Sequence, residues 1–240
     1  MEELKHDYKV LIIIPAYNEE GNIKQTCETI KEYDPDLSFI VINDCSTDNT
    51  AKVCAENGYK YINNIFNLGI GGAVQTGYKY AYNNGYDIAI QFDGDGQHDV
   101  NYVKDIVKPI AEGQANFVIG SRFIDDTSGF KSTAARRIGI KIISGLIGIF
   151  TFKKITDPTS GFRAANKDII KLFAGNYPVE YPEPETIMTL IRNKYMVKEV
   201  PVIMHERTAG ISSIRSWKSA YYMTNVAISI FIASIRRKRR

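Results

Sequence analysis

The first half of the sequence alternates short apolar runs with segments of helical spacing, and this rhythm constrains the fold more than any other feature. Residues 10–14 and 39–42 are continuous apolar runs, and residues 22–33 between them carry apolar side chains at helical spacing. Such runs are typical of strands buried on both faces. Strands that alternate with helices form mostly parallel sheets with right-handed crossovers. The sequence therefore predicts an α/β fold, with a mostly parallel sheet flanked by helices.

The remaining elements are placed by the same criteria. Further strands are expected at residues 59–62, 87–92, 117–119 and 199–204, and further helices at 71–82, 100–111, 138–150, 167–173, through Leu190 and from about 216. Residues 125–133 and 156–163 are expected to form loops. No segment has the composition of an interdomain linker. We therefore expect one domain over residues 1–215, followed by a basic amphipathic helix over residues 216–240.

Composition excludes several classes of protein. The net charge of +3 is too small to indicate nucleic acid binding. The three cysteines, Cys27, Cys45 and Cys54, lack the spacing of metal ligands and favour a reducing compartment. The polar start shows no signal peptide, and no apolar run reaches the roughly 18 residues of a membrane span. We expect a cytoplasmic protein.

Polar residues follow three of the expected strands. They are residues 15–19 (PAYNE), residues 43–44 (Asn-Asp) and residues 93–95 (Asp-Gly-Asp). Asp-Gly can also mark a hairpin, but ligands of open parallel sheets bind beyond the carboxyl ends of the strands. Asp93 and Asp95 are spaced to reach one hard cation, Mg²⁺ or Mn²⁺, with substrate phosphates completing its shell. His98 is a further candidate metal ligand, or alternatively an exposed turn residue.

A glycine-rich turn, residues 67–73, opens the helix expected at 71–82. It does not match the dinucleotide fingerprint, because Val74 stands where the third glycine belongs. Two interpretations stay open. The backbone around Asn67 and Gly71 presents N–H groups to phosphate or ribose, or the glycines allow close packing of helix on sheet.

These motifs together resemble the family-2 glycosyltransferases of the GT-A (Rossmann-like) fold. The resemblance is carried by PAYNE, by D-x-S-x-D-x-T at residues 44–50, by N-x-G-x-G-G-A at 67–73 and by D-G-D-G-Q-H at 93–98. The segment D-P-T-S-G-F-R at residues 157–163 is similar to that of enzymes like dolichyl-phosphate-mannose synthase. The likeness covers about residues 8–215 and implies transfer of a sugar from a nucleotide sugar.

The resemblance implies roles for particular residues. Those expected to bind the nucleotide sugar are Pro15, Tyr17, Glu19, Asp44, Asn67, Gly71, Asp93, Gly94, Asp95, Gln97, Arg122, Ser160 and Arg207. Asp93 and Asp95 would form a DxD pair that contacts ribose, diphosphate and metal. Arg122 and Arg163 would stabilise phosphate charge through bidentate contacts. Arg207 would belong to a mobile loop that closes over the diphosphate.

An inverting displacement needs a base if the nucleophile is a hydroxyl, but not if it is already a phosphate anion. Glu183 and Glu185 are candidates for this base or for binding the acceptor, and Asp157 is the third candidate. The alternative for both glutamates is a purely structural role, because acids at a helix N-terminus favour the helix dipole.

The end of the sequence suggests a membrane surface. Trp217, Tyr221, Tyr222 and an apolar face through Ile235 precede five consecutive basic residues. A helix of this kind is typical of attachment to anionic lipid, although packing on the domain is the alternative. We expect a peripheral protein on the cytoplasmic face of the membrane. Its acceptor would be a polyprenyl phosphate or lipid-linked glycan of cell-surface (cell wall) polysaccharide or glycolipid synthesis, and a membrane protein is a further expected partner.

Two other functions are open at this point. A nucleotidyltransferase that makes the nucleotide sugar would need a Gly-rich, Arg- or Lys-bearing loop where this chain has residues 15–22, PAYNEEGN. A noncatalytic sugar-nucleotide scaffold is disfavoured because Asp93, Asp95, Asp157 and Arg163 are all present. The nucleotide is expected to be uridine diphosphate.

Overall fold

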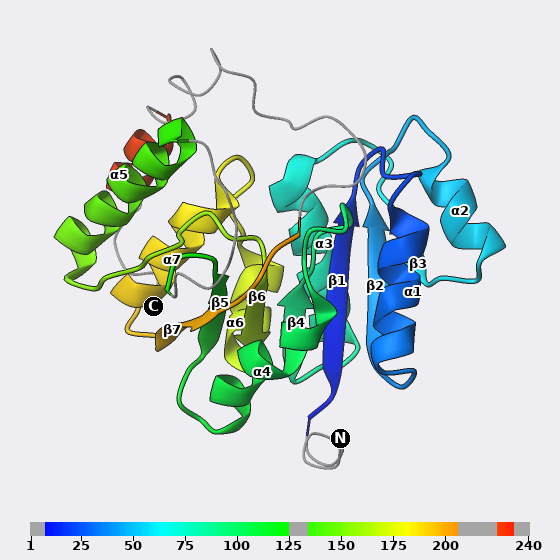
Figure 1. Ribbon diagram of the computed structural model, residues 1–240, viewed down its shortest axis with the longest axis horizontal. Helices are drawn as coiled ribbons and strands as arrows, with labels where there is room; N and C mark the ends of the chain where they lie inside the picture. The colour runs from blue at the N-terminus through cyan, green and yellow to red at the C-terminus, as the bar shows by residue number, and fades with distance from the viewer. Residues whose placement is uncertain (1–7, 125–133, 206–224, 233–240) are drawn as a thin grey trace.

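The computed structural model describes residues 8–124, 134–205 and 225–232, and its centre is one twisted sheet of seven strands (Figure 1). The strands are β1 (Val10–Ala16), β2 (Ser38–Asn43), β3 (Tyr61–Asn63), β4 (Ile88–Gln91), β5 (Phe117–Ser121), β6 (Arg163–Asn166) and β7 (Val197–Pro201). Their order across the sheet is β3-β2-β1-β4-β6-β5-β7. The predicted α/β architecture is confirmed.

The sheet is mixed because β6 runs against its neighbours. β1 pairs in parallel with β2 and β4, β2 with β3, and β5 with β7, whereas β6 is antiparallel to both β4 and β5. The sequence analysis missed β6. Its four residues, RAAN, follow directly on the segment 156–163 that was expected to be a loop, and so short a run carries little periodicity.

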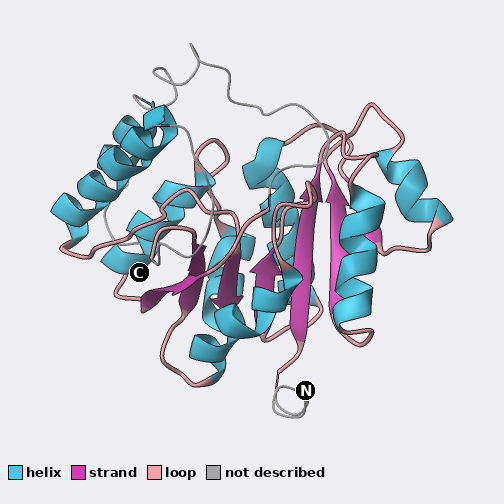
Figure 2. Ribbon diagram, in the orientation of Figure 1, coloured by secondary structure: helices cyan, strands magenta, loops and turns pink. Residues whose placement is uncertain are grey.

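Helices cover both faces of the sheet (Figure 2). They are α1 (Ile23–Tyr33), α2 (Thr50–Glu56), α3 (Gly69–Asn83), the short 3-10 helix η1 (Val100–Tyr102), α4 (Val103–Ala111), α5 (Ala134–Thr151), α6 (Lys167–Gly175) and α7 (Pro182–Arg192). Successive residues of β1 alternate between the two cores: Leu11 and Ile13 belong to one, and Ile12 and Ile14 to the other. This alternation explains why β1 is apolar throughout.

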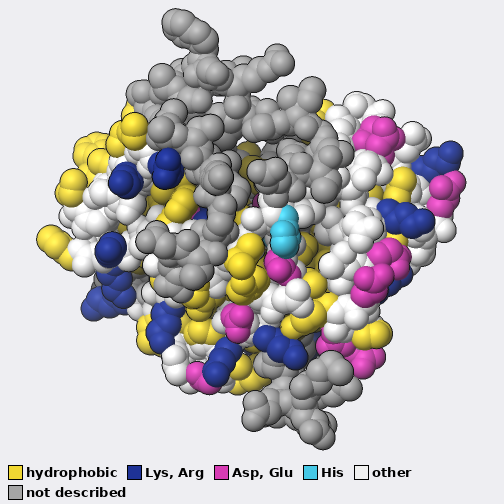
Figure 3. Space-filling view, viewed as in Figure 1, with side chains coloured by type: hydrophobic (Ala, Val, Ile, Leu, Met, Phe, Trp, Pro, Cys, Tyr) yellow, Lys and Arg dark blue, Asp and Glu magenta, His cyan; other side chains and the backbone are white. Residues whose placement is uncertain are grey.

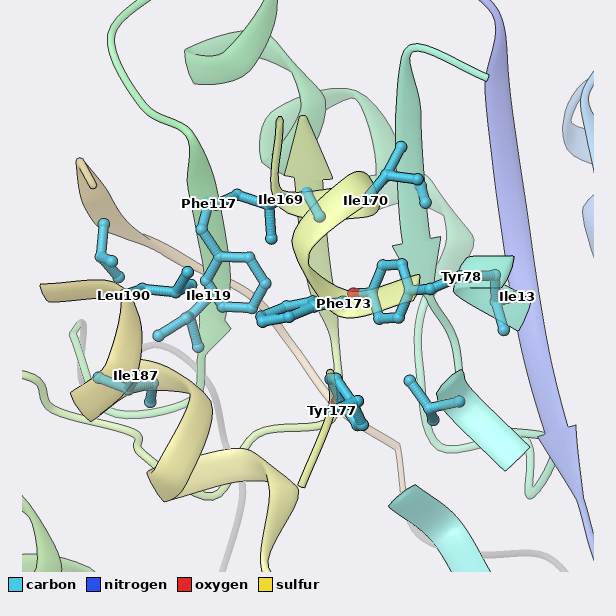
Figure 4. Close-up of a cluster of buried hydrophobic side chains, with 14 of the residues drawn as sticks. Ile13, Tyr78, Phe117, Ile119, Ile169, Ile170, Phe173, Tyr177, Ile187 and Leu190 are labelled. Atoms are coloured by element: carbon cyan, nitrogen blue, oxygen red, sulfur yellow. The ribbon is translucent and has the colours of Figure 1, made fainter. Parts of the chain in front are cut away.

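One core lies between the sheet and α3, α6 and α7. Tyr78, Phe173 and Tyr177 form a group of aromatic rings with centroids 4.9 to 5.6 Å apart (Figure 4). Rings at such spacing add roughly 0.5–1.5 kcal/mol per pair beyond the burial of their area. This core supports α7, whose first turn reaches the carboxyl edge of the sheet.

The last described helical segment, residues 225–232, packs on the domain. Val226 and Ile230 are fully buried in the same core as Ile147 of α5, and the rings of Phe150 and Phe231 lie 6.2 Å apart. Helix–domain packing, the alternative in the sequence analysis, therefore holds for residues 225–232. Most of the predicted interfacial helix, including Trp217 and the basic end, lies outside the described residues. None of the helices in the described part of the chain has the length and apolarity that a membrane span needs.

Candidate active site

A cleft of about 800 Å³ opens at the carboxyl edge of the sheet. It is lined by Pro15, Ala16, Tyr17, Asn18, Glu19, Asp44, Asn67, Gly69, Ile70, Ala73, Asp93, Gly94, Asp95, Thr159, Gly161 and Glu183. The motifs at the ends of β1, β2 and β4 meet there because these three strands are parallel neighbours. We call the loops after β1, β2 and β3 (residues 15–19, 43–50 and 64–70) the first wall. Residues 156–163 and 182–186 form the second wall.

The first wall is held together by hydrogen bonds between its loops. The Asn18 backbone N–H donates to the Ser46 hydroxyl (3.0 Å), and the Asn18 side-chain oxygen accepts from the Thr47 backbone N–H (2.8 Å). The Glu19 N–H donates to the Thr50 hydroxyl over 2.9 Å. Asn18 adopts a positive φ of 56°, a conformation that asparagine tolerates better than most residues. The cleft is thus preorganised on this side.

Asp44 lies buried at the base of the first wall and fixes the glycine-rich turn. Its carboxylate accepts hydrogen bonds from the Leu68 backbone N–H (2.9 Å) and from the Asn64 side-chain amide (2.8 Å). Asn67 donates from its side chain to the Asp44 carbonyl oxygen (3.3 Å). Asp44 and Asn67 both line the cleft, as their predicted role in nucleotide binding requires.

Gly71 serves helix packing. A Cβ at this position would overlap the backbone carbonyl oxygens of Pro178 and Val179, and Gly71 does not line the cleft. Of the two interpretations left open for this glycine, the structure supports close packing of α3. The nucleotide contact predicted for Gly71 is therefore not supported, and Gly69, two residues earlier, lines the cleft instead.

The loop 93–98 brings Asp93 and Asp95 to the cleft and is fixed by its own side chains. The Gln97 backbone N–H donates to Asp95 (3.1 Å), and the Gln91 side-chain amide donates to Asp93 (3.4 Å). In the described ranges, no group of three or more His, Cys, Asp or Glu side chains is arranged to hold a metal. Both carboxylates line the cleft, as their predicted role at a cation shared with substrate phosphates requires.

His98 is a buried packing residue. Its ring stacks on Phe162 with the centroids 4.9 Å apart, and its Nδ1 accepts the Asp93 backbone N–H over 3.0 Å. Burial lowers the pKa of His98, so the ring favours its neutral form. The exposed turn position is wrong, because His98 is 6% exposed and packs against the Phe92 and Phe162 rings. Its Nε2 lies 3.5 Å from the Asp93 Oδ2, and the ligand role stays a prediction. His98 fixes the backbone of Asp93.

The 156–161 loop contacts Asp93 directly. A Cβ on Gly161 would lie 2.6 Å from the Asp93 Oδ2, so any larger residue would displace this carboxylate. Two sequence motifs far apart in the chain thus meet at one side chain. The sequence analysis quoted the motif but did not single out Gly161 or its neighbour Thr159, although both line the cleft.

Asp157 and Arg122 form a buried ion pair beside the cleft. Arg122 donates from Nε to Asp157 Oδ2 (2.6 Å) and from Nη2 to Oδ1 (2.7 Å), and both side chains are almost wholly inaccessible. A carboxylate held in this way is poorly suited to act as a general base. Arg122 Nη2 also donates to the Thr159 hydroxyl, which connects the pair to the cleft lining. Neither member of the pair lines the cleft itself.

Arg163 and Ser160 are buried members of the second wall. Arg163 donates to the backbone oxygens of Ser160 (2.5 Å), Glu183 (3.0 Å) and Pro158 (3.2 Å), and to the Thr186 hydroxyl (2.9 Å). It is 1% exposed, so the predicted contact with phosphate is not supported in this arrangement. Instead Arg163 joins the loop to the start of α7. Ser160 is also buried and does not line the cleft.

Glu183 is the one of the three candidate bases that lines the cleft. It occupies the first turn of α7, and burial raises the pKa of its carboxyl. Glu185 follows on the same turn but is not part of the lining. The helix-N-terminal position predicted for both residues is confirmed, and it coexists with a cleft position for Glu183 alone.

His205 is the last described residue before the gap at residues 206–224, and it contacts the 93–98 loop of the cleft. The His205 backbone N–H donates to the Gln97 carbonyl oxygen (2.8 Å), and Met204 pairs with His98 in an isolated antiparallel bridge. The segment that leads to residue 206 is thus attached to the 93–98 loop. Arg207, predicted to close over the diphosphate, lies outside the described residues.

Comparison with known proteins identifies the class. The family described as Glycosyl transferase family 2 matches residues 11–173. The chain is 32% identical over 219 residues to the UDP-N-acetylglucosamine–dolichyl-phosphate N-acetylglucosaminyltransferase of Methanococcus voltae, with 82% of this chain and 85% of that enzyme covered. It is 29% identical over 227 residues to the dolichol-phosphate mannosyltransferase of Pyrococcus furiosus, covering 91% of this chain and 62% of that enzyme.

A solved structure confirms the GT-A fold. Glucosyl-3-phosphoglycerate synthase from Mycobacterium tuberculosis, in complex with Mn²⁺, uridine diphosphate and phosphoglyceric acid, superimposes with a TM-score of 0.70. The alignment covers 96% of this chain and 80% of that one at 17% identity. The protein is therefore a GT-A-fold glycosyltransferase. It belongs to glycosyl transferase family 2, which decides against the nucleotidyltransferase and the noncatalytic scaffold.

Proposed function

We propose that the enzyme transfers a sugar from a UDP-sugar to a polyprenyl-type lipid phosphate, with inversion at the anomeric carbon and with Mg²⁺ or Mn²⁺. The observation that carries the proposal is the placement of Asp93 and Asp95 in one cleft with the first wall. Two relatives named for dolichyl- or dolichol-phosphate support the acceptor class, and one of them is named for a UDP-sugar donor. An acceptor phosphate oxygen would bond to the anomeric carbon as the bond from that carbon to the diphosphate breaks, releasing UDP.

The first wall and the two aspartates divide the work of donor binding. Tyr17, Glu19 and Asp44 line the part of the cleft suited to the base and ribose. Asp93 and Asp95 would hold the divalent cation together with the donor diphosphate. When bound, this cation neutralises the charge that develops on the leaving diphosphate. The matching contribution of the chain is to keep both carboxylates fixed through Gln91, Gln97 and His98.

The second wall favours an acceptor that needs no general base. Asp157 is held by Arg122, which leaves Glu183 as the carboxyl of the three candidates that reaches the cleft. Burial raises the pKa of Glu183, and its carboxyl lines the cleft where it can hydrogen-bond the sugar or the acceptor. A phosphate anion is its own nucleophile. Glu183 is therefore assigned to binding the sugar or the acceptor.

An apolar stripe on α5 supports attachment to a membrane surface. Ile138, Ile142 and Ile149 lie on one side of the helix at spacings of four and seven residues, and Phe152 just beyond it is 96% exposed. Exposed hydrophobic side chains gather at the edge of the molecule occupied by α5 (Figure 3). The neighbouring helical segment adds Ile228, Phe231 and Ile232. Exposed basic residues on and after α5, Arg137, Lys141, Lys153 and Lys154, suit an anionic surface.

The activity is tested with radiolabelled UDP-sugars, Mn²⁺ and detergent-solubilised polyprenyl phosphate. We expect the label of one sugar to enter the lipid fraction and Asp95→Asn to lower this transfer by about 10²-fold or more. Asp99→Asn is the matched control, because Asp99 caps η1 through the Asn101 N–H and asparagine caps equally well. Transfer only to a hydroxyl acceptor, or full activity of Asp95→Asn, would contradict the proposal.

Glu183→Gln separates the two acceptor classes. With a phosphate acceptor, we expect this variant to retain transfer within a few-fold, because glutamine preserves hydrogen bonding without a base. A loss of about 10²-fold or more would assign Glu183 as a general base and favour a hydroxyl acceptor.

Membrane attachment is tested by co-sedimentation with anionic liposomes. Ile142→Glu combined with Ile149→Glu should release the full-length chain, whereas Met196→Glu, at an exposed position before β7, should not. Equal binding of both variants would remove the α5 surface from the proposal.

A further inference from the structure

Glu199 lies on β7, outside the cleft, yet its carboxylate accepts three hydrogen bonds from two consecutive residues of the second wall. The backbone N–H groups of Thr156 and Asp157 each donate over 2.8 Å, and the Thr156 hydroxyl donates over 3.0 Å. Hydrogen bonds to a carboxylate are about twice as strong as neutral ones. Glu199 therefore fixes the beginning of the 156–161 loop. Burial raises the pKa of Glu199, and the three hydrogen bonds oppose that shift.

Asp157 links this fixed point to Arg122. Its backbone is held by Glu199 and its carboxylate binds the Arg122 guanidinium through two hydrogen bonds. Arg122 then donates to the Thr159 hydroxyl (3.0 Å), and Thr159 lines the cleft. The position of the cleft residue Thr159 thus depends, through a hydrogen bond at every step, on a strand residue that does not line the cleft.

The same loop ends against the proposed metal-binding carboxylate. Gly161 lies so close to Asp93 that there is no room for a Cβ between them. A shift of the loop towards Asp93 would displace the carboxylate, and a shift away would open space beside it. Either displacement would change the position of Asp93 relative to Asp95 in the cleft.

We infer that Glu199 is a positioning residue for glycosyl transfer. It fixes the position of the 156–161 loop and thereby places Arg122, Thr159 and Gly161 correctly relative to Asp93. The inference rests on the proposed use of the cleft. It assigns to β7 a function in catalysis beyond its place in the sheet.

The side chain of Glu199 is separable from the sheet pairing of β7. β7 pairs with β5 along five residues, with Ile119 opposite Glu199, and these contacts belong to the backbone. Glu199→Gln keeps the size of the side chain but turns one acceptor into an N–H₂ donor, which faces the N–H donors of residues 156–157. The loop should therefore move while the strand stays.

The experiment compares full-length Glu199→Gln, Thr156→Val and Lys198→Gln. Lys198, next to Glu199 on β7, donates to Gln114 on the exposed surface and is the matched control. Transfer from a UDP-sugar to polyprenyl phosphate gives kcat and KM. Binding of UDP without a divalent cation measures the affinity of the first wall, and thermal unfolding measures stability.

For Glu199→Gln we expect kcat to fall between about 10- and 100-fold, because small misplacements in an active site have effects of this size. The affinity for UDP without a divalent cation should stay within about two-fold, because Glu199 holds residues 156–157 of the second wall and the base and ribose are assigned to the first wall. Thr156→Val removes one of the three hydrogen bonds to Glu199 together with the 2.7 Å bond between the Thr156 and Ser121 hydroxyls, and should lose about three- to ten-fold in kcat. Lys198→Gln should behave as the wild type.

An unchanged kcat in folded Glu199→Gln and Thr156→Val overturns the inference. So does a parallel fall of kcat, UDP affinity and melting temperature, which is the result of a merely structural role. If Asp95→Asn stays active, the proposed function fails whatever Glu199 does, so the two failures are distinguishable.

Discussion

The two walls of the cleft are built by different means. The first wall consists of loops that follow parallel strands, and short side chains such as Asn18, Ser46 and Thr50 join them to one another. The second wall depends on two buried arginines. Arg122 pairs with the Asp157 carboxylate, and Arg163 donates to backbone oxygens such as that of Glu183. Loss of one neutral hydrogen bond costs little, whereas loss of one member of a buried ion pair leaves the other charge uncompensated. Substitutions should therefore have graded effects in the first wall and large effects in the second.

The largest effect is expected on stability, from Asp157→Ala. The substitution leaves Arg122 buried without its counter-ion, which costs about 3–5 kcal/mol. Urea unfolding measures the loss. The double variant Asp157→Leu with Arg122→Met removes both charges and should lose less than the single variant. If the single variant is the more stable of the two, the second wall does not depend on the pair.

Gly161→Ala should abolish most activity while the protein stays folded. The new Cβ would lie 2.6 Å from Asp93 Oδ2 and displace that carboxylate, so we expect a fall in kcat/KM of about 10²-fold. Steady-state transfer assays measure it. Gly175→Ala is the control, because a Cβ there meets nothing within 4 Å. Similar kinetics for both alanine variants would show that Gly161 and Asp93 are not tightly packed.

Gly71→Ala tests the helix packing behind the first wall. The added Cβ overlaps two carbonyl oxygens of residues 178–179, so α3 must shift, at a cost of about 1–3 kcal/mol. Chemical denaturation measures this cost. An unaltered unfolding midpoint would return Gly71 to the nucleotide-contact interpretation.

Asn18→Ala should weaken binding of the donor and leave the transfer step little changed. The variant loses the hydrogen bond to Thr47 and places alanine at a positive φ, so we expect KM for the donor to rise about five-fold with kcat little changed. Asn18→Gly relieves the backbone and should recover part of the loss. A change in kcat without a change in KM would contradict the assignment of donor binding to the first wall.

The smallest effect is the pH dependence of stability at Glu183. Burial raises the pKa of this carboxyl in the folded state above its unfolded value. The favourable contribution of its neutral form is therefore complete below the unfolded pKa and is lost as pH rises through the folded pKa. Glu183→Gln should stabilise the protein at neutral pH and have no such effect near pH 4. Unfolding at both pH values checks the sign, and a stabilisation confined to acid would contradict it.

The first wall could be predicted from the sequence because its residues are local to strand ends. Pro15, Asp44 and Asp93 each follow an apolar run, and parallel strands bring such ends together. The second wall could not, since its contacts are nonlocal. The burial of His98 was not predicted because its neighbour Phe162 is far away in the chain, and the contacts of Arg163 with backbone oxygens of α7 have no signature in the sequence.

Glu199 left no signal at all in the sequence. It stands in an ordinary strand, and its importance depends on three donors contributed by residues 156–157. β6 was missed for a related reason, because four residues flanked by a loop motif have too little periodicity. The chemistry of a site is thus easier to predict than the side chains that hold it in position.

The reversed direction of β6 has a consequence for how the enzyme can be re-engineered. β5 ends and β6 begins at the same edge of the sheet, with Ile119 opposite Arg163, so the segment 122–162 leaves and re-enters the fold at neighbouring points. A segment whose ends are already adjacent tolerates changes of length, since loop closure depends only weakly on length. Residues 122–162 include α5 and most of the second-wall loop, whereas the first wall lies entirely outside them. Exchanging this segment between related enzymes should therefore transplant acceptor preference and leave the donor unchanged.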